Sequence, residues 1–192
     1  MSSCSLAANI VSACWLIFMT VWLLAAISTK RSVYRENLGQ RLRYLLLLIA
    51  ACVLLTRARR LPYPLNLHLI VCTNAVAWIC AASCLIGLAL CLWARTVLGR
   101  NWSGAVTLKE GHEFIERGPY RLVRHPIYTG LLAMYLGSAV LLGQVGGLVG
   151  VLLLFGSFWI KLRNEEKIML GQFPEQYAAY QQRVKRIIPF IL

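Results

Sequence analysis

The sequence predicts an all-α integral membrane protein, a bundle of about five transmembrane helices. Three observations favour this fold class. Hydrophobic residues make up 59% of the 192-residue chain and charged residues only 14%. Long apolar runs recur along the chain, and a hydrocarbon core of about 30 Å requires about 20 such residues as a helix. The Lys and Arg residues gather between these runs, as they do in the loops of membrane proteins.

The first part of the expected single membrane domain, 1–98, holds three apolar runs. The run 6–28 carries no charge and is long enough to span a bilayer. The run 44–56 is short for a span, but the stems of the arginines on either side can extend it toward water. The run 67–92 is long and can continue to Leu98. We therefore expect three transmembrane helices here.

The remaining part, 99–192, is the expected catalytic part of the same domain. The polar stretch 95–125 starts just before this part and leads into it. It is the longest polar stretch between apolar runs. Two further apolar runs occupy 127–142 and 148–160, and a glycine-rich turn, 143–147, joins them. Because glycines permit tight turns, these runs predict a helical hairpin. The polar tail, 161–192, predicts helix on either side of a break near Pro174.

The distribution of charge predicts the orientation in the membrane. The net charge is +13, and with five spans 17 of the 20 basic residues fall on one side. Only Arg57, Arg59 and Arg60 fall on the other side. The positive-inside rule therefore places the N-terminus outside, and the long polar loop and the C-terminus in the cytoplasm. The same pattern explains the basic balance without nucleic acid, which we do not expect as a partner.

Residue types exclude several kinds of chemistry. All seven acidic residues are Glu, so a mechanism that needs Asp is excluded. The seven Cys residues lack the paired spacing and nearby His residues of a zinc site, so no metal is expected. We interpret them as small packing residues, and their spacing argues against a disulfide scaffold. The glycine pattern GQVGGLVG lacks the strand and the Lys-Ser/Thr of a phosphate loop.

Three polar clusters are expected on the cytoplasmic face, at 118–130, 161–166 and 173–183. Pro suits the first position of a helix, so His125-Pro126 predicts a helix start whose free NH groups favour an anion such as a carboxylate. The acidic pair in 161–166 follows the last apolar run. Its basic neighbours can also balance it without any ligand, so a plain interfacial charge cluster remains the alternative.

These clusters carry a resemblance to a known family. The segment Arg124-His-Pro-Ile-Tyr128, preceded by Gly118-Pro-Tyr120 and followed by Glu165-Glu166, resembles the isoprenylcysteine carboxyl methyltransferase family. Phe173, Tyr177 and Tyr180 extend the resemblance, which covers roughly 101–190. The upstream helices are similar only in number and hydrophobicity.

The resemblance implies a membrane enzyme that uses S-adenosylmethionine. Members of the family hold this cofactor between the last helices and the C-terminal segment, without a Rossmann domain. The family's cofactor-binding positions correspond here to His112, Glu113, Phe114, Ile115, Tyr120, His125, Pro126, Ile127, Tyr128 and Glu165. The polar loop and the helical tail would thus form the cofactor site.

The expected reaction is carboxyl O-methylation of an isoprenylcysteine-like substrate, a lipophilic or prenylated molecule that enters from the bilayer lipids. A carboxylate is ionised at neutral pH, so the site needs alignment and a positioning cation more than a base. The candidates for this catalytic role are Arg124, Lys161 and Arg163. The family has an Arg four residues before the Glu, where this chain has Lys161, so either Lys161 or Arg163 can fill that role.

Three other functions remain open from the sequence. A related phospholipid amine N-methyltransferase would favour acidic or aromatic substrate contacts, and the basic cluster argues against it. Sterol reductases of related fold use a nicotinamide cofactor and are larger. A non-enzymatic membrane protein, such as a transporter subunit or an assembly factor, would not need His125, Tyr128 and Glu165 together. The sequence carries no prediction of the oligomeric state.

Overall fold

The computed structural model describes residues 2–26, 32–35, 37–102, 107–109, 114–189 and 191, and its main elements are six α-helices. The helices are α1 (Ser3–Ala26), α2 (Leu38–Thr56), α3 (Asn74–Leu98), α4 (Pro126–Leu142), α5 (Val145–Gln172) and α6 (Pro174–Arg183). Three short 3-10 turns are η1 (Ala58–Arg60), η2 (Gly99–Asn101) and η3 (Gly118–Arg121). Two short strands, β1 (Ser32–Arg35) and β2 (Thr107–Lys109), pair antiparallel.

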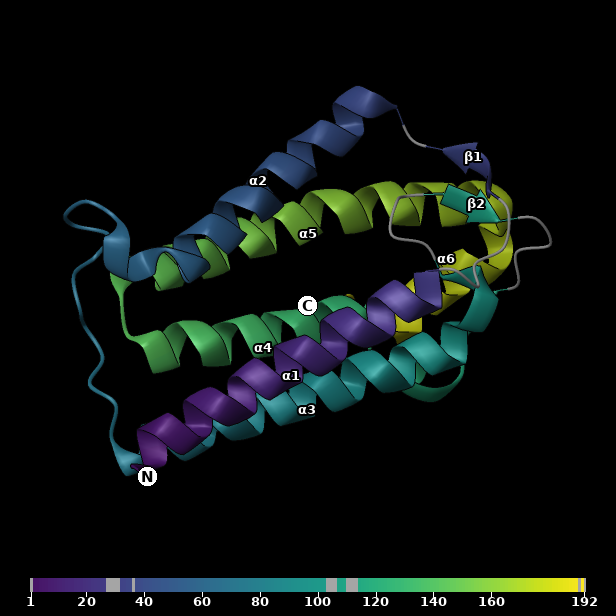
Figure 1. Cartoon of the computed structure of the whole chain (residues 1–192). Helices are drawn as coiled ribbons and strands as arrows, with labels where there is room; N and C mark the ends of the chain where they lie inside the picture. The colour runs from purple at the N-terminus through teal and green to yellow at the C-terminus, as the bar shows by residue number, and fades with distance from the viewer. Residues whose placement is uncertain are drawn as a thin grey trace.

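The long helices lie side by side in two groups (Figure 1). Helices α1 and α3 pack beside α4, and α2 packs beside α5. The N-terminus, the α2–α3 connection and the α4–α5 turn lie at one end of the bundle, and α6 with the β1–β2 ribbon lies at the other. We call the second end, which carries 114–129 and 161–187, the site end.

The apolar surface of the bundle identifies an integral membrane protein. In the described residues, α1, α2, α3 and α5 are long and apolar enough to cross a membrane, and α4 is a shorter apolar helix. Large hydrophobic side chains point outward from these helices, among them Leu16, Leu46, Ile79 and Leu152. Helices satisfy their own backbone groups in hydrocarbon, so their side chains can face lipid. The predicted helical membrane bundle is confirmed.

Glycines allow α3 and α4 to approach closely. A Cβ atom at Gly87 would lie 2.5 Å from the carbonyl oxygen of Gly130, and a Cβ atom at Gly130 would lie 2.6 Å from the Cys91 sulfur. Small residues bring helix backbones together in membrane proteins, where packing rather than water drives association. The contact fixes α4, whose first turn belongs to the site, against α3.

Two helices differ from the predicted runs. Helix α2 begins at Leu38 and has 19 residues, so it includes the exposed Arg41 and Arg43, the arginines before the run that the sequence suggested as an extension. Helix α3 begins at Asn74 rather than Leu67, after Thr73 caps it by accepting a hydrogen bond from the Val76 NH at 3.3 Å. The segment before it pairs with the α4–α5 turn, where Leu69 donates its NH to the Gly143 carbonyl oxygen at 2.8 Å. An apolar sequence alone does not show this backbone pairing.

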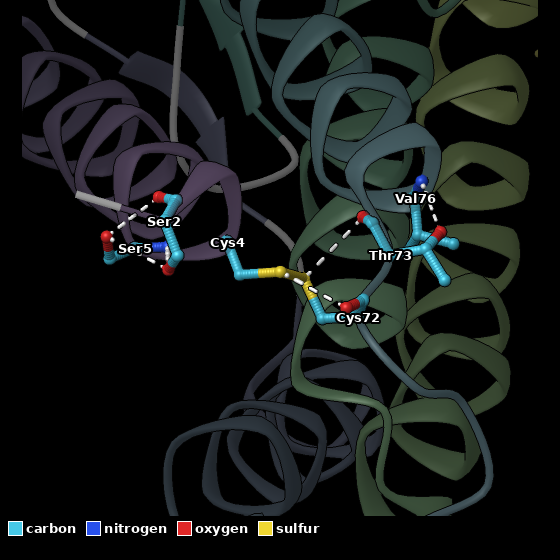
Figure 2. Close-up of a disulfide and its surroundings, with 6 residues drawn as sticks. All are labelled: Ser2, Cys4, Ser5, Cys72, Thr73 and Val76. Carbon is cyan, nitrogen blue, oxygen red and sulfur yellow. Dashed lines mark hydrogen bonds between the residues drawn. A yellow bond between two sulfur atoms is a disulfide. The ribbon is translucent and has the colours of Figure 1, made fainter.

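A disulfide joins the first and third helices, contrary to the interpretation of the cysteines as packing residues only. Cys4 in the first turn of α1 and Cys72 just before α3 are bonded, with 6.2 Å between their Cα atoms (Figure 2). The pair is 68 residues apart in the chain, so local spacing could not reveal it. Cys14, Cys80, Cys84 and Cys91 are free and buried, as packing residues are expected to be.

Candidate functional site

The turn η3 brings the first polar cluster of the sequence, 118–130, against the end of α3. Gly118 has φ 62°, and a Cβ atom there would lie 2.9 Å from the Val97 side chain. Glycine therefore permits both the backbone conformation and the close approach. Helix α4 then begins at Pro126, whose fixed φ suits the first helical position. His125 precedes it as the N-cap residue.

Helix α5 directs its acidic pair toward α4 because of a four-residue repeat. Leu154, Phe158, Leu162 and Glu166 are all buried, and residues four apart lie on one face of a helix. Glu166 continues this apolar stripe at the point where α5 reaches the site end. Glu165 lies beside it, with 26% of its side chain exposed.

An aromatic stack links α4 to α5. The His125 and Tyr128 rings are 5.5 Å apart and nearly parallel, and Tyr128 stacks on Phe158 at 4.7 Å. The Tyr128 hydroxyl donates a 2.6 Å hydrogen bond to Glu165 Oε1. The structure thus brings together three residues that the sequence predicted for one cofactor site: His125, Tyr128 and Glu165.

The Glu166 carboxylate is the centre of a buried ionic network. It is 4% exposed and accepts from Arg124, with Nε at 2.9 Å and the second terminal nitrogen at 2.8 Å from Oε1. His125 Nε2 lies 3.3 Å from the same oxygen, and Arg186 Nε donates to Oε2 at 3.0 Å. Charge-assisted bonds of this kind are stronger than neutral ones, so the network joins α5 to the start of α4 and to the C-terminal segment.

The segment after α6 lies along the start of α4. The NH groups of Arg124 and His125 donate to the carbonyl oxygens of Lys185 and Arg186, at 2.7 and 2.9 Å. Thr129 Oγ1 donates to the Ile187 carbonyl oxygen at 2.7 Å. The backbone bonds bring residues about 60 positions apart in sequence into one layer at the site end.

Arg124, a predicted catalytic cation, is fully engaged in holding these parts together. It is 8% exposed, and besides Glu166 it donates to the carbonyl oxygens of Gln181, at 3.2 Å, and Val184. The Glu166 carboxylate balances its charge. This geometry favours a positioning role for Arg124.

Lys161 lies between two tyrosine rings. Its ammonium nitrogen is 5.6 Å from the ring centroid of Tyr44 on α2 and 5.5 Å from that of Tyr128 on α4, which are cation–π distances. Glu165 follows one turn later on the same face of α5. Arg163, the other predicted cation, is exposed on α5. The structure therefore brings Lys161, rather than Arg163, to Tyr128.

Phe114 belongs to a second aromatic group, formed with the α5–α6 junction and α6. Its ring is 5.7 Å from Phe173, 5.9 Å from Tyr177 and 5.5 Å from Tyr180. Burial raises the pKa of the Tyr177 and Tyr180 hydroxyls, so both stay neutral and can donate. The Tyr180 hydroxyl donates to the Tyr120 carbonyl oxygen at 2.5 Å. This group fixes η3 against α6.

The remaining predicted cofactor-binding residues have other surroundings or lie outside the described residues. Ile127 packs in the apolar cluster of α1, α3 and α4, and its carbonyl oxygen accepts from the Cys91 thiol at 3.4 Å. Pro126 is buried in the first turn of α4, and Ile115 is half-buried. His112 and Glu113 lie outside the described residues.

Three residues of the site had no predicted role. Glu166 was part of the motif, and its four-residue spacing from Leu162 is the feature that could have indicated its burial. Arg186 lies in a tail without a periodic pattern. Tyr44, 2% exposed, opens an apolar run that is far from the site in sequence, and no local pattern marks it.

Comparison with known proteins places this geometry in context. Residues 78–171 match the model of the isoprenylcysteine carboxyl methyltransferase (ICMT) family. This range includes Tyr128, Glu165 and Glu166, whereas α1, α2 and α6 lie outside it.

Individual relatives carry related names. A probable protein-S-isoprenylcysteine O-methyltransferase of Oryza sativa subsp. indica is 30% identical over 119 residues, or 60% of this chain and 62% of the relative. The protein-S-isoprenylcysteine O-methyltransferase of Schizosaccharomyces pombe is 31% identical over 122 residues, which is 62% of this chain and 50% of the relative. The chain thus spans between half and two thirds of the length of these curated relatives.

Proposed function

We propose that this chain, whose residues 78–171 match the isoprenylcysteine carboxyl methyltransferase family, acts as a member of that family and methylates the carboxylate of a lipophilic acceptor such as an isoprenylcysteine. The methyl donor of this proposal is S-adenosylmethionine. The observation that carries the proposal is the joining of Lys161, Tyr128 and Glu165 at the site end. It unites a cation for the acceptor with aromatic and acidic groups for the donor.

The side chains at the site end fit the donor in chemical type. S-adenosylmethionine, when bound, supplies a methyl carbon on a positively charged sulfur, open to displacement by a carboxylate oxygen. Glu165, partly exposed, can accept hydrogen bonds from hydroxyl groups. The faces of Tyr128 and His125 suit an aromatic base or a cation. Tyr120 in the turn η3 and Phe114 just before this turn contribute further aromatic surface.

Lys161 is our candidate for holding the acceptor carboxylate. A carboxylate with an ordinary pKa of about 3 to 4 is ionised at neutral pH, so its oxygen can attack without a base. An ammonium is a single point charge, whereas an Arg grips a carboxylate with two parallel bonds. Lys161, held by the rings of Tyr44 and Tyr128, can therefore orient the acceptor while leaving one oxygen available. Arg163 remains the second candidate.

In this proposal Glu166 and Arg124 do not touch the reacting molecules; they hold other side chains and backbone segments in position. Glu166 holds His125, which stacks on Tyr128, and Arg124 holds the segment after α6. Together they keep the reacting partners aligned, and alignment contributes much of the rate in a direct transfer between two bound molecules. The lipid part of the acceptor would enter from the bilayer between helices.

Two observations support a cytoplasmic position for the site end. Most of the basic residues belong to loops and to the tail at this end. The Cys4–Cys72 disulfide lies at the opposite end, and disulfides persist in oxidising compartments outside the cytosol. We propose that the N-terminus lies outside, and the long polar loop and the C-terminus in the cytoplasm.

Binding of S-adenosylhomocysteine to the detergent-purified chain, measured by calorimetry, tests the donor. We expect saturable binding that weakens at least about tenfold in Glu165→Ala and in His125→Ala. Each substitution removes a side chain that the proposal places against the ligand, and a hydrogen bond that involves a charged group is worth this much. Arg59→Gln, an exposed change at the opposite end, is the control and should bind like the parent. A folded chain that binds no S-adenosylhomocysteine would contradict the proposal.

Radiolabelled methyl transfer then tests the acceptor. An N-acetylated prenylcysteine with a free carboxylate should accept the label, and its methyl ester should not. Lys161→Met should raise the KM for this acceptor and leave the affinity for S-adenosylhomocysteine unchanged. Label on phosphatidylethanolamine instead of the prenylcysteine would favour the amine N-methyltransferase.

A further inference from the structure

The C-terminal end of α3 carries a buried cation that the proposed mechanism does not use. Arg95 is 6% exposed, and Asn101 in η2 is 8% exposed. Both lie at the site end, where the Tyr120 hydroxyl of η3 donates a 3.5 Å hydrogen bond to the carbonyl oxygen of Ala94, the residue before Arg95. Arg95 is therefore a neighbour of the turn that leads to His125.

The contacts of Arg95 fix its guanidinium plane. Its two terminal nitrogens donate to the carbonyl oxygens of Gly99, at 2.5 Å, and Ala25, at 2.9 Å. Its central carbon lies 4.7 Å from the ring centroid of Trp102. The carbonyls at the ends of α1 and α3 attract a cation, but they are neutral. Among the residues that the structure describes, Arg95 has no carboxylate partner.

Two buried polar atoms at the end of α3 and in η2 have no hydrogen-bond partner among the described residues. They are Nε of Arg95, a charged donor, and Oδ1 of Asn101, an acceptor. An unsatisfied buried group is costly, so such atoms call for an explanation such as an absent ligand. A ligand that satisfies both must present an anionic acceptor and a donor. An α-amino acid does so with its carboxylate and its ammonium group.

We propose that Arg95 and Asn101 bind the α-amino-acid head of a ligand, with Arg95 Nε donating to the carboxylate and Asn101 Oδ1 accepting from the ammonium. Trp102 holds the guanidinium plane in place for this contact. The inference rests on the proposed function, because S-adenosylmethionine carries such a head. A prenylcysteine with a free amino group carries the same chemistry, so the two sources are separated by experiment.

The test compares two thioether nucleosides, one with this head and one with a methyl group in place of the amino-acid chain. S-adenosylhomocysteine has the amino-acid head, and 5′-methylthioadenosine lacks it. We expect Arg95→Gln and Asn101→Ala to weaken S-adenosylhomocysteine binding at least about tenfold in calorimetry, and to change 5′-methylthioadenosine binding less than about twofold. Arg121→Gln, an exposed change in η3, should affect neither ligand.

The two variants guard against a folding defect. Arg95 also ties the ends of α1 and α3 together, so its substitution can destabilise the chain. Asn101→Ala removes an acceptor that has no partner in the described part of the chain, so a loss there points to the ligand. Retained 5′-methylthioadenosine binding serves as the measure of an intact site in both variants.

The outcomes separate the hypotheses. A selective loss for S-adenosylhomocysteine supports the site and assigns it to the donor. In Asn101→Ala, a selective loss for a free prenylcysteine over its N-acetylated form, with S-adenosylhomocysteine unaffected, supports the site and assigns it to the acceptor. The inference is overturned if Asn101→Ala affects S-adenosylhomocysteine and 5′-methylthioadenosine equally and also affects the free and the N-acetylated prenylcysteine equally. A parent protein that binds neither adenosine ligand contradicts the proposed function instead.

Discussion

The Glu166 carboxylate is surrounded by three basic side chains: Arg124, His125 and Arg186. A buried charge is tolerated when partners satisfy its lone pairs, and it becomes a liability when one partner is removed. Glu166 meets the first condition with bonds to both oxygens. The position of His125, and through it Tyr128, depends on this carboxylate.

Glu166→Gln removes the charge and leaves Arg124 and Arg186 facing a neutral amide. We expect a loss of about 3 to 5 kcal/mol in the free energy of unfolding, as for other broken buried pairs. Denaturant unfolding in detergent micelles, followed by circular dichroism, measures this. Glu175→Gln, an exposed change in α6, is the control and should change stability little. Equal stability of both variants would show that the network contributes nothing.

The sequence predicted part of this site and could not predict the rest. His125, Tyr128 and Glu165 belong to a motif, and the structure joins them. The Arg186–Glu166 pair depends on how the segment after α6 folds back, which no local periodicity encodes. Tyr44 reaches Lys161 only because α2 packs on α5. Contacts between distant helices are set by packing, and one sequence read alone does not contain them.

At the scale of elements, apolar length predicted which segments are helices, and backbone pairing decided where they end. The apolar segment 67–73 is extended because it pairs with the α4–α5 turn, as in the bridge between His68 and Gln144. The β1–β2 ribbon was not predicted. Its two strands have only four and three residues. The paired residues Arg35 and Thr107 are 72 positions apart in the sequence, so no local pattern joins them.

The α3–α4 contact provides a prediction at this scale. In Gly130→Ala the new methyl group would meet the Gly87 carbonyl oxygen at 2.5 Å, and both neighbours are held by helices. We expect a destabilisation of about 1 to 3 kcal/mol from overpacking. Gly156→Ala in α5 is the matched control, because its nearest neighbour is the end of the Leu47 side chain at 3.9 Å.

Thermal unfolding of both glycine variants in the same detergent measures this difference. Alanine is the better helix former by up to about 1 kcal/mol, so Gly156→Ala should be neutral or stabilising while Gly130→Ala lowers the midpoint. A midpoint for Gly130→Ala at or above that of the parent would mean that α3 and α4 can separate without cost.

At the scale of the whole molecule, the two ends of the bundle differ in chemistry. One end carries the disulfide, and the other carries the ionic network and most of the basic residues. Both features favour the same orientation, although they arise independently. Charge acts on insertion into the membrane, whereas the disulfide records the redox state of the compartment that it faces.

The orientation predicts which cysteines a reagent can reach from outside an intact cell. After reduction with an impermeant phosphine, an impermeant maleimide should label Cys4 and Cys72 without permeabilisation, and Cys4→Ser with Cys72→Ser should abolish that labelling. Arg121→Cys, exposed in η3 at the site end, should react only after the membrane is opened. The reverse pattern would place the site outside, where a donor made in the cytosol does not reach it, and the proposed function would then need an acceptor and a donor supplied from that side.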